Sequence, residues 1–179
     1  MQKNILVIEN NPKHLESTLS VLQSNELSSI FHVIHKCFPF LDQNRADRDQ
    51  QKDKIINYIN SECNSKQIDI LMIDMLLGGD NAHDPLGLEI LNIVKSHGKI
   101  TCFIAQTQLI GSQVDILKNN NVKNIILKPG DTHAKYDERP ITCVKYEDRC
   151  CENTTGYCTY IKNFICEMKR IYNEMKGTI

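Results

Sequence analysis

The sequence predicts an α/β protein built on a doubly wound parallel sheet, and three features of the chain lead to this prediction. Short aliphatic runs with the length of buried strands recur along the chain. Stretches with apolar residues at helical spacing separate these runs. Several runs stop directly at a polar residue, as strands do where an open α/β sheet faces its ligand crevice. We therefore expect five strands alternating with five helices in one parallel sheet.

The run at residues 68–74 is the most strand-like of these segments, and it ends at Asp74. Pro12 suits the first turn of a helix, where its missing N–H has no partner to lose, and Gly98 suits the position just beyond a helix. The charged segment 45–54 is expected to be the exposed start of a helix whose last turns face the core. The other expected strands are residues 4–8, 29–37, 100–105 and 122–127. The expected helices are residues 12–23, 85–96, 111–119 and 157–176, with one more that starts at residue 45 and includes Ile55, Ile56 and Ile59.

Length and composition point to one cytoplasmic domain spanning residues 1–179. Hydrophobic residues make up 41% of the chain and charged residues 24%, which is usual for a globular protein. The formal net charge of −1 gives no global indication of DNA or an anionic membrane as a partner. No signal peptide is evident, and no apolar run approaches the ~20 residues of a membrane span. The sequence therefore predicts a protein that binds neither DNA nor a membrane.

Polar residues follow three of the expected strands at their carboxyl ends. Glu9 and Asn10 follow the first strand, Asp74 ends the third, and Lys128 follows the fifth. Because parallel strands share one carboxyl edge, these side chains can converge, although Asp74 could also simply begin a loop. Two carboxylates suit Mg²⁺, which takes oxygen ligands, and a lysine can offset phosphoryl charge. Asp74 as a nucleophile would form an acyl phosphate.

Four segments in this order resemble the receiver domain of two-component response regulators. They are residues 5–12 (ILVIENNP), 70–74 (ILMID), 87–91 (GLEIL) and 126–129 (ILKP). The resemblance implies a flavodoxin-like (βα)5 fold and transfer of a phosphoryl group to Asp74 from a histidine kinase or a phosphotransfer protein. It also implies that Lys128 pairs with the phosphoryl group. The implied Mg²⁺ ligands are Glu9, Asn10, Asp74 and the backbone carbonyl of Leu76.

The chain departs from the family pattern at several of these positions. Asn10 stands where the family usually has the aspartate that binds the metal directly, so Mg²⁺ binding should be weakened. Gln106 stands where a serine or threonine hydrogen-bonds the phosphoryl group, although Thr107 is adjacent. Ile125 stands at the position of the aromatic switch residue. Extra residues are expected at about 40–55 and at 131–156.

Three functions remain open on this basis. The first is a stand-alone atypical receiver that is phosphorylated on Asp74, signals by protein contact and is no enzyme beyond autodephosphorylation. The second is a phosphorylation-independent pseudo-receiver, which would be a protein-binding module. The third is a flavodoxin-like protein that binds a nucleotide or flavin, although no glycine-rich phosphate loop follows the first strand. The resemblance also suggests a homodimer through the last helix and the fifth strand.

The region before the last helix is rich in cysteine and has no clear periodicity. It is expected to be an irregular insertion at residues 131–156, with reduced thiols. A zinc site and a redox-sensitive disulfide are alternatives, although the closely spaced ligand pairs of structural zinc sites are absent. The cysteines concerned are Cys143, Cys150, Cys151 and Cys158.

Overall fold

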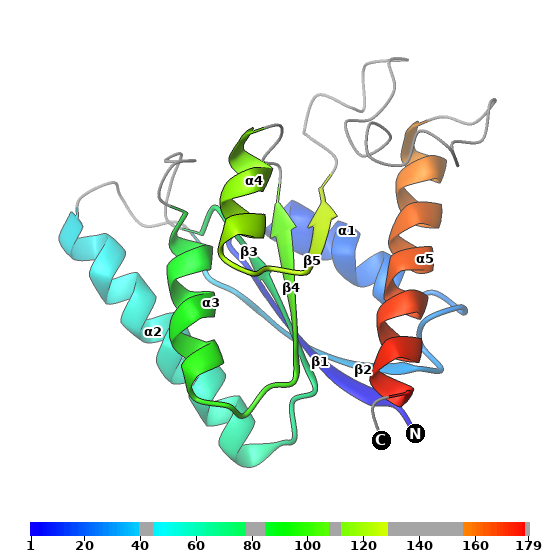
Figure 1. Cartoon of the computed structure of the whole chain (residues 1–179), viewed down its shortest axis with the longest axis horizontal. Helices are drawn as coiled ribbons and strands as arrows, with labels where there is room; N and C mark the ends of the chain where they lie inside the picture. The colour runs from blue at the N-terminus through cyan, green and yellow to red at the C-terminus, as the bar shows by residue number, and fades with distance from the viewer. Residues whose placement is uncertain (40–44, 78–84, 108–111, 129–155, 178–179) are drawn as a thin grey trace.

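A five-stranded parallel sheet lies between two layers of helices in the computed structural model of the chain (Figure 1). The structure describes residues 1–39, 45–77, 85–107, 112–128 and 156–177. The strands are β1 (Lys3–Glu9), β2 (Phe31–Cys37), β3 (Ile70–Asp74), β4 (Cys102–Thr107) and β5 (Asn124–Leu127). The helices are α1 (Pro12–Leu22), α2 (Arg45–Ser65), α3 (Leu86–Ser96), α4 (Ser112–Asn119) and α5 (Gly156–Lys176). The strand order is β2-β1-β3-β4-β5, which confirms the predicted doubly wound, flavodoxin-like (βα)5 fold.

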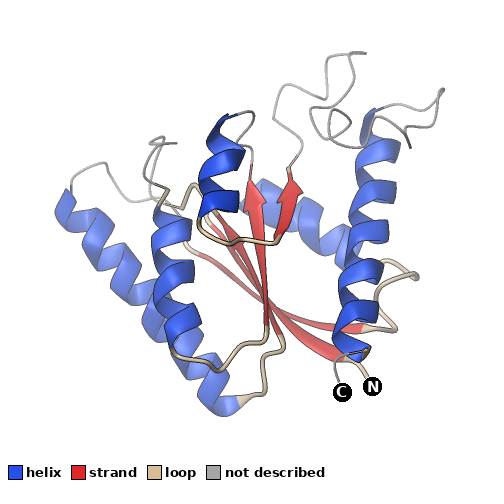
Figure 2. Cartoon of the chain, viewed as in Figure 1, coloured by secondary structure: helices blue, strands red, loops and turns tan. Residues whose placement is uncertain are grey.

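Helices cover both faces of the sheet (Figure 2), and each layer packs on the sheet in a separate hydrophobic core. Alternate strand residues pack against α2, α3 and α4, whereas the residues between them pack against α1 and α5. The strand β3 is central, so all five of its residues are buried. Parallel strands that are covered on both faces read as continuous apolar runs, which explains why this strand was recognisable in the sequence.

The helix ends follow the expected local chemistry. Asn11 caps α1, because its side-chain oxygen accepts a hydrogen bond from the Lys13 backbone N–H at 3.0 Å, and Pro12 is the first helical residue. Gly98 follows the C-cap of α3 with a φ of 66°, as predicted. Strand β4 runs to Thr107, two residues beyond the expected end at residue 105.

The helix α2 starts at Arg45, as expected, and continues through the predicted core-facing turns to Ser65. The charged residues 45–54 form its first half. Gln51 is only 4% exposed within this half, so the expectation of a wholly exposed start was wrong at this position. Lys52 Nζ lies 2.7 Å from Glu89 Oε1, which ties α2 to α3.

The predicted cysteine-rich insertion at residues 131–156 lies outside the described residues but for Gly156, the first residue of α5, as do Cys143, Cys150 and Cys151. Residue 158 falls within α5. Cys166 is exposed on α5. Across the described part of the chain, none of the helices combines the length and the apolar character needed to cross a bilayer.

Candidate functional site

An acid–lysine cluster, formed by Glu9, Asp74 and Lys128, lies at the carboxyl edge of the sheet. Lys128 Nζ is 2.5 Å from Glu9 Oε2 and 2.9 Å from Asp74 Oδ2. Their residues are 0%, 3% and 5% exposed, respectively. The structure thus brings together three side chains that are far apart in the chain, because β1, β3 and β5 end at the same edge.

The strand alternation directs all three side chains toward the layer of α1 and α5. Asp74 continues the side of β3 that carries Ile70 and Met72, both of which pack in that layer's core. The strand β4 lies between β3 and β5, so the lysine must reach across it. The backbone N–H of Lys128 donates to the Thr107 carbonyl at 2.7 Å, which fixes the start of this reach. Because β5 and β3 are two strand spacings, about 10 Å, apart, the extended lysine and the carboxylate side chains meet over β4.

Burial shapes the electrostatics of the acid–lysine cluster. The pKa of Glu9 is raised above its ordinary value, first by burial and then by the nearby Asp74 carboxylate. Lys128 and the backbone N–H of Asn11 oppose this rise. Two carboxylates share one ammonium group, so the cluster buries more negative than positive charge. Perturbed acids of this kind collect at functional sites.

The loop that follows Asp74 is hydrogen-bonded to the acid–lysine cluster. Asp74 Oδ1 accepts the Leu76 N–H at 3.2 Å, and Glu9 Oε1 accepts the N–H groups of Asn10 and Asn11 at 3.0 and 3.1 Å. The Asn10 side-chain amide donates from Nδ2 to the Leu76 carbonyl at 3.0 Å. The four residues named as Mg²⁺ ligands are therefore adjacent in space.

These residues do not fit a bound Mg²⁺ in the arrangement observed. In a Mg²⁺ site, the Leu76 carbonyl would face the cation, and residue 10 would supply an oxygen ligand. Here the Leu76 carbonyl instead accepts a hydrogen bond from the Asn10 side-chain N–H. The oxygens of Glu9 and Asp74 are already in contact with N–H groups or with Lys128. Within the described ranges, no three His, Cys, Asp or Glu side chains gather closely enough to hold a metal.

Gln106 and Thr107, the two residues considered for a phosphoryl contact, are consecutive in β4. Their side chains therefore point to opposite faces of the sheet. Gln106 lies in register with Asp74 and is 1% exposed, but its Nε2 donates to Thr18 Oγ1 on α1 at 2.6 Å. Its Oε1 is buried with no hydrogen-bond partner among the described residues. Thr107 is fully buried and in register with Leu127. Gln106 therefore connects the end of β4 to α1.

Ile125, at the expected position of the aromatic switch, packs against the core formed with α2, α3 and α4. Two further residues at the site were missed from the sequence. Thr18 carries no signal that could have revealed it, because it is one hydroxyl within an ordinary helix. Gln51 does carry a recognisable sequence signal. It precedes the buried Ile55 and Ile59 by four and eight residues, which places all three on one face of a helix.

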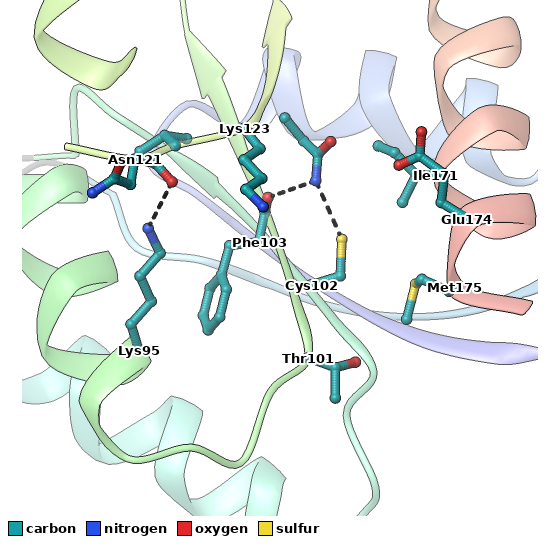
Figure 3. Close-up of a pocket in the computed structure, with 11 residues that line it drawn as sticks. Lys95, Thr101, Cys102, Phe103, Asn121, Lys123, Ile171, Glu174 and Met175 are labelled. Carbon is teal, nitrogen blue, oxygen red and sulfur yellow. Dashed lines mark hydrogen bonds between the residues drawn. The ribbon is translucent and has the colours of Figure 1, made fainter. Parts of the chain in front are cut away.

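A recess of about 420 Å³ lies at the opposite, amino edge of the sheet (Figure 3). Asn124 also lines it, and its side-chain amide donates to the Phe103 carbonyl at 3.3 Å and to Cys102 Sγ at 3.5 Å. Burial raises the pKa of the Cys102 thiol to about 11, which makes it a poor nucleophile. The charged residues that line the recess are not buried; they are Lys95, Lys123 and Glu174.

Comparison with known proteins gives a fold relationship. No model of a known protein family matches the sequence, and no curated protein matches it. RcsB from Salmonella enterica serovar Typhimurium, bound to promoter rprA with the phosphomimetic BeF₃⁻, is 15% identical with a TM-score of 0.50, over 74% of this chain and 93% of that chain. Another structure of the Salmonella typhimurium RcsB response regulator is 15% identical with a TM-score of 0.50, over 83% of this chain and 68% of that one.

The isolated REC domain of the Salmonella RcsB matches 72% of this chain and 78% of its own, at 16% identity and a TM-score of 0.48. The chain has the fold of a response-regulator receiver domain, as the sequence motifs predicted.

Proposed function

We propose that this chain is a receiver-type signalling domain that accepts a phosphoryl group on Asp74. The observation that carries the proposal is the buried contact of 2.9 Å between the Asp74 carboxylate and Lys128 Nζ, at the carboxyl edge of a receiver fold. A buried cluster with excess carboxylate is costly for stability alone, because desolvation of charge outweighs much of the attraction. A chemical role would account for a buried cluster of this kind.

In the proposed reaction, an Asp74 oxygen attacks the phosphorus of a phosphohistidine on a kinase or phosphotransfer protein. The new O–P bond forms as the N–P bond breaks, and the leaving imidazole nitrogen keeps the electron pair and takes up a proton. The Lys128 ammonium would stay beside the transferred group and offset its negative charge. Glu9, on the other side of Lys128, would hold the ammonium in place.

The proposed output is contact with another protein, by a domain that is cytoplasmic and has no enzymatic activity beyond autodephosphorylation. The face formed by α4, β5 and α5 would serve a partner or a homodimer. Binding to the promoter rprA is described for RcsB and is not carried over to this chain. For this chain we propose a protein partner and not DNA, since its formal net charge is −1.

The test is treatment of the purified chain with acetyl phosphate, followed by intact mass measurement. We expect one added phosphoryl group in the wild type and none in Asp74→Asn. The matched control is Asp69→Asn, which alters the buried carboxylate next to the other end of β3 and should leave phosphorylation intact. The reaction is run with and without Mg²⁺, because the observed ligand arrangement does not fit the ion.

A second function is favoured by the enclosure of the site. The Asp74 side chain is 5% exposed, and the Leu76 carbonyl already accepts a hydrogen bond from the Asn10 side-chain amide. Both features suit a pseudo-receiver that binds a protein without phosphorylation. An unchanged mass after phosphodonor treatment of folded protein would exclude phosphorylation on Asp74 and favour this second function.

A further inference from the structure

We infer that two side-chain amides, Asn10 and Gln51, replace a divalent cation in holding the loop after Asp74, so that the site keeps its shape without metal. We call this pair the amide latch. The inference deepens the proposed function, on which it rests only for the identity of the site. It concerns how the loop is held, whether or not Asp74 is phosphorylated.

The first half of the amide latch joins β1 to the loop. Asn10 follows β1, and its Nδ2 donates to the Leu76 carbonyl at 3.0 Å. An aspartate at position 10 could not make this contact, because two oxygens would face each other without a proton or a cation between them. The amide therefore does for the Leu76 carbonyl what a shared cation would do between two oxygen ligands.

The second half of the amide latch comes from the first half of α2. Gln51 is 4% exposed, and its Nε2 donates to the Leu77 carbonyl at 3.1 Å and toward the Phe38 carbonyl at 3.4 Å. It thereby joins the end of β2 to the loop after β3. Asn10 and Gln51 thus hold two consecutive carbonyl groups, those of Leu76 and Leu77.

Further hydrogen bonds hold Met75 and Leu76 at the start of the same loop. The Met75 N–H donates to the Gln106 carbonyl at 3.0 Å, and the Met75 carbonyl accepts the Gly87 N–H at 3.0 Å. The Leu76 N–H is bound by Asp74 Oδ1. Residues 75, 76 and 77 are thus each hydrogen-bonded to other protein groups.

The charge of the cluster fits the same conclusion. Lys128 contacts both Glu9 and Asp74, which leaves one negative charge in excess among these three residues. An aspartate at position 10 would add a further carboxylate directly after Glu9 and beside the Leu76 carbonyl. Such a site would need a cation, whereas the neutral amide of Asn10 removes that need.

Thermal unfolding of the full chain in EDTA and in saturating Mg²⁺, without any phosphodonor, tests the amide latch. We expect the same Tm for the wild type in both solutions. Asn10→Asp should have a lower Tm than the wild type in EDTA, and Mg²⁺ at a hundredfold excess over its Kd should raise it by about 5–10 °C. Gln51→Ala is the matched control, because it should lower the Tm equally in both solutions.

Two results would overturn the inference: a wild type that Mg²⁺ stabilises as much as Asn10→Asp, or an Asn10→Asp variant that folds and does not respond to Mg²⁺. If Asn10→Asp fails to fold, the side-chain NH₂ resonances of Asn10 in the wild type decide. They are assigned by their loss in Asn10→Ala and should be unchanged on addition of Mg²⁺, whereas a saturable shift would contradict the amide latch. Because no phosphodonor is present, failure of Asp74 phosphorylation leaves both readouts unaffected.

Discussion

Lysine–carboxylate contacts occur beside both ends of β3, but their surroundings differ. Next to the amino end, Lys3 Nζ lies 3.2 Å from Asp69 Oδ1, and the side chains are 23% and 10% exposed. At the carboxyl end, Lys128 Nζ lies 2.9 Å from Asp74 Oδ2, and the side chains are 3% and 5% exposed. The amino-edge pair matches one acid with one base, whereas the carboxyl-edge cluster adds the buried Glu9.

The difference separates a structural clamp from a chemical site. Asp69 also accepts the Asn4 backbone N–H at 2.8 Å, so this pair ties β1 to β3 and balances its own charge. The carboxyl-edge cluster buries an additional carboxylate and raises the pKa of Glu9, which a clamp does not require. The recess of Figure 3 shows that space alone is a poor guide, since it lies at the amino edge among exposed charges.

The largest expected effect on the free energy of unfolding comes from removing Lys128, which Glu9 and Asp74 share. Lys128→Ala leaves Glu9 and Asp74 buried beside each other without a cation, and the free energy of unfolding should fall by about 3–5 kcal/mol. Lys3→Ala removes the partly exposed lysine and should lower it by about 1 kcal/mol or less. Urea unfolding measures both. Equal losses would show that the two contacts are energetically alike and would break the comparison.

A smaller effect is expected where α3 meets the end of β3. A Cβ at Gly87 would lie 2.0 Å from the Asp74 carbonyl oxygen, so Gly87→Ala should lower the free energy of unfolding by about 3 kcal/mol through overpacking. The matched control at the amino edge is Gly98→Ala, which meets no atom within 4 Å and should lose about 1 kcal/mol from its φ of 66°. Urea unfolding compares them, and a Gly87→Ala variant as stable as Gly98→Ala would contradict the close approach.

Most of the fold could be predicted because its signals are local. The buried run at residues 68–74, Pro12 at a helix start and Gly98 beyond a helix end each follow from the chemistry of a few neighbouring residues. The strand ends were less certain. Strand β4 includes Gln106 because pairing with β3 continues to Asp74, and one sequence does not reveal that register.

The acid–lysine cluster could be predicted as a meeting of strand ends, but its hydrogen bonds could not. The direction of Gln106 toward Thr18 depends on how α1 packs, which is a tertiary property. The Asn10 amide could be recognised as a lost charge, whereas its contact with the Leu76 carbonyl depends on the path of the loop after Asp74. The sequence therefore predicted which groups meet, and packing determined what each group contacts.

The smallest expected effect is a pH dependence that belongs to the carboxyl edge. Because the pKa of Glu9 is raised above 4.5 in the folded chain, the folded state holds this proton to higher pH than the unfolded state does. Stability from this group is therefore lost as pH rises from 4.5 through the raised pKa. Glu9→Gln removes the loss, so its free energy of unfolding relative to the wild type should increase across that window.

Urea unfolding at constant ionic strength and stepped pH measures the difference between Glu9→Gln and the wild type. Asp74→Asn is the matched control, because the Asp74 carboxylate is the second cause of the raised Glu9 pKa. Its removal should shrink the pH dependence, while Glu9 stays buried and keeps part of the effect. A difference that stays constant with pH would mean that the pKa of Glu9 is the same in the folded and the unfolded chain. In that case Lys128 would balance the two carboxylates as fully as Lys3 balances Asp69, and the two ends of β3 would differ only in burial.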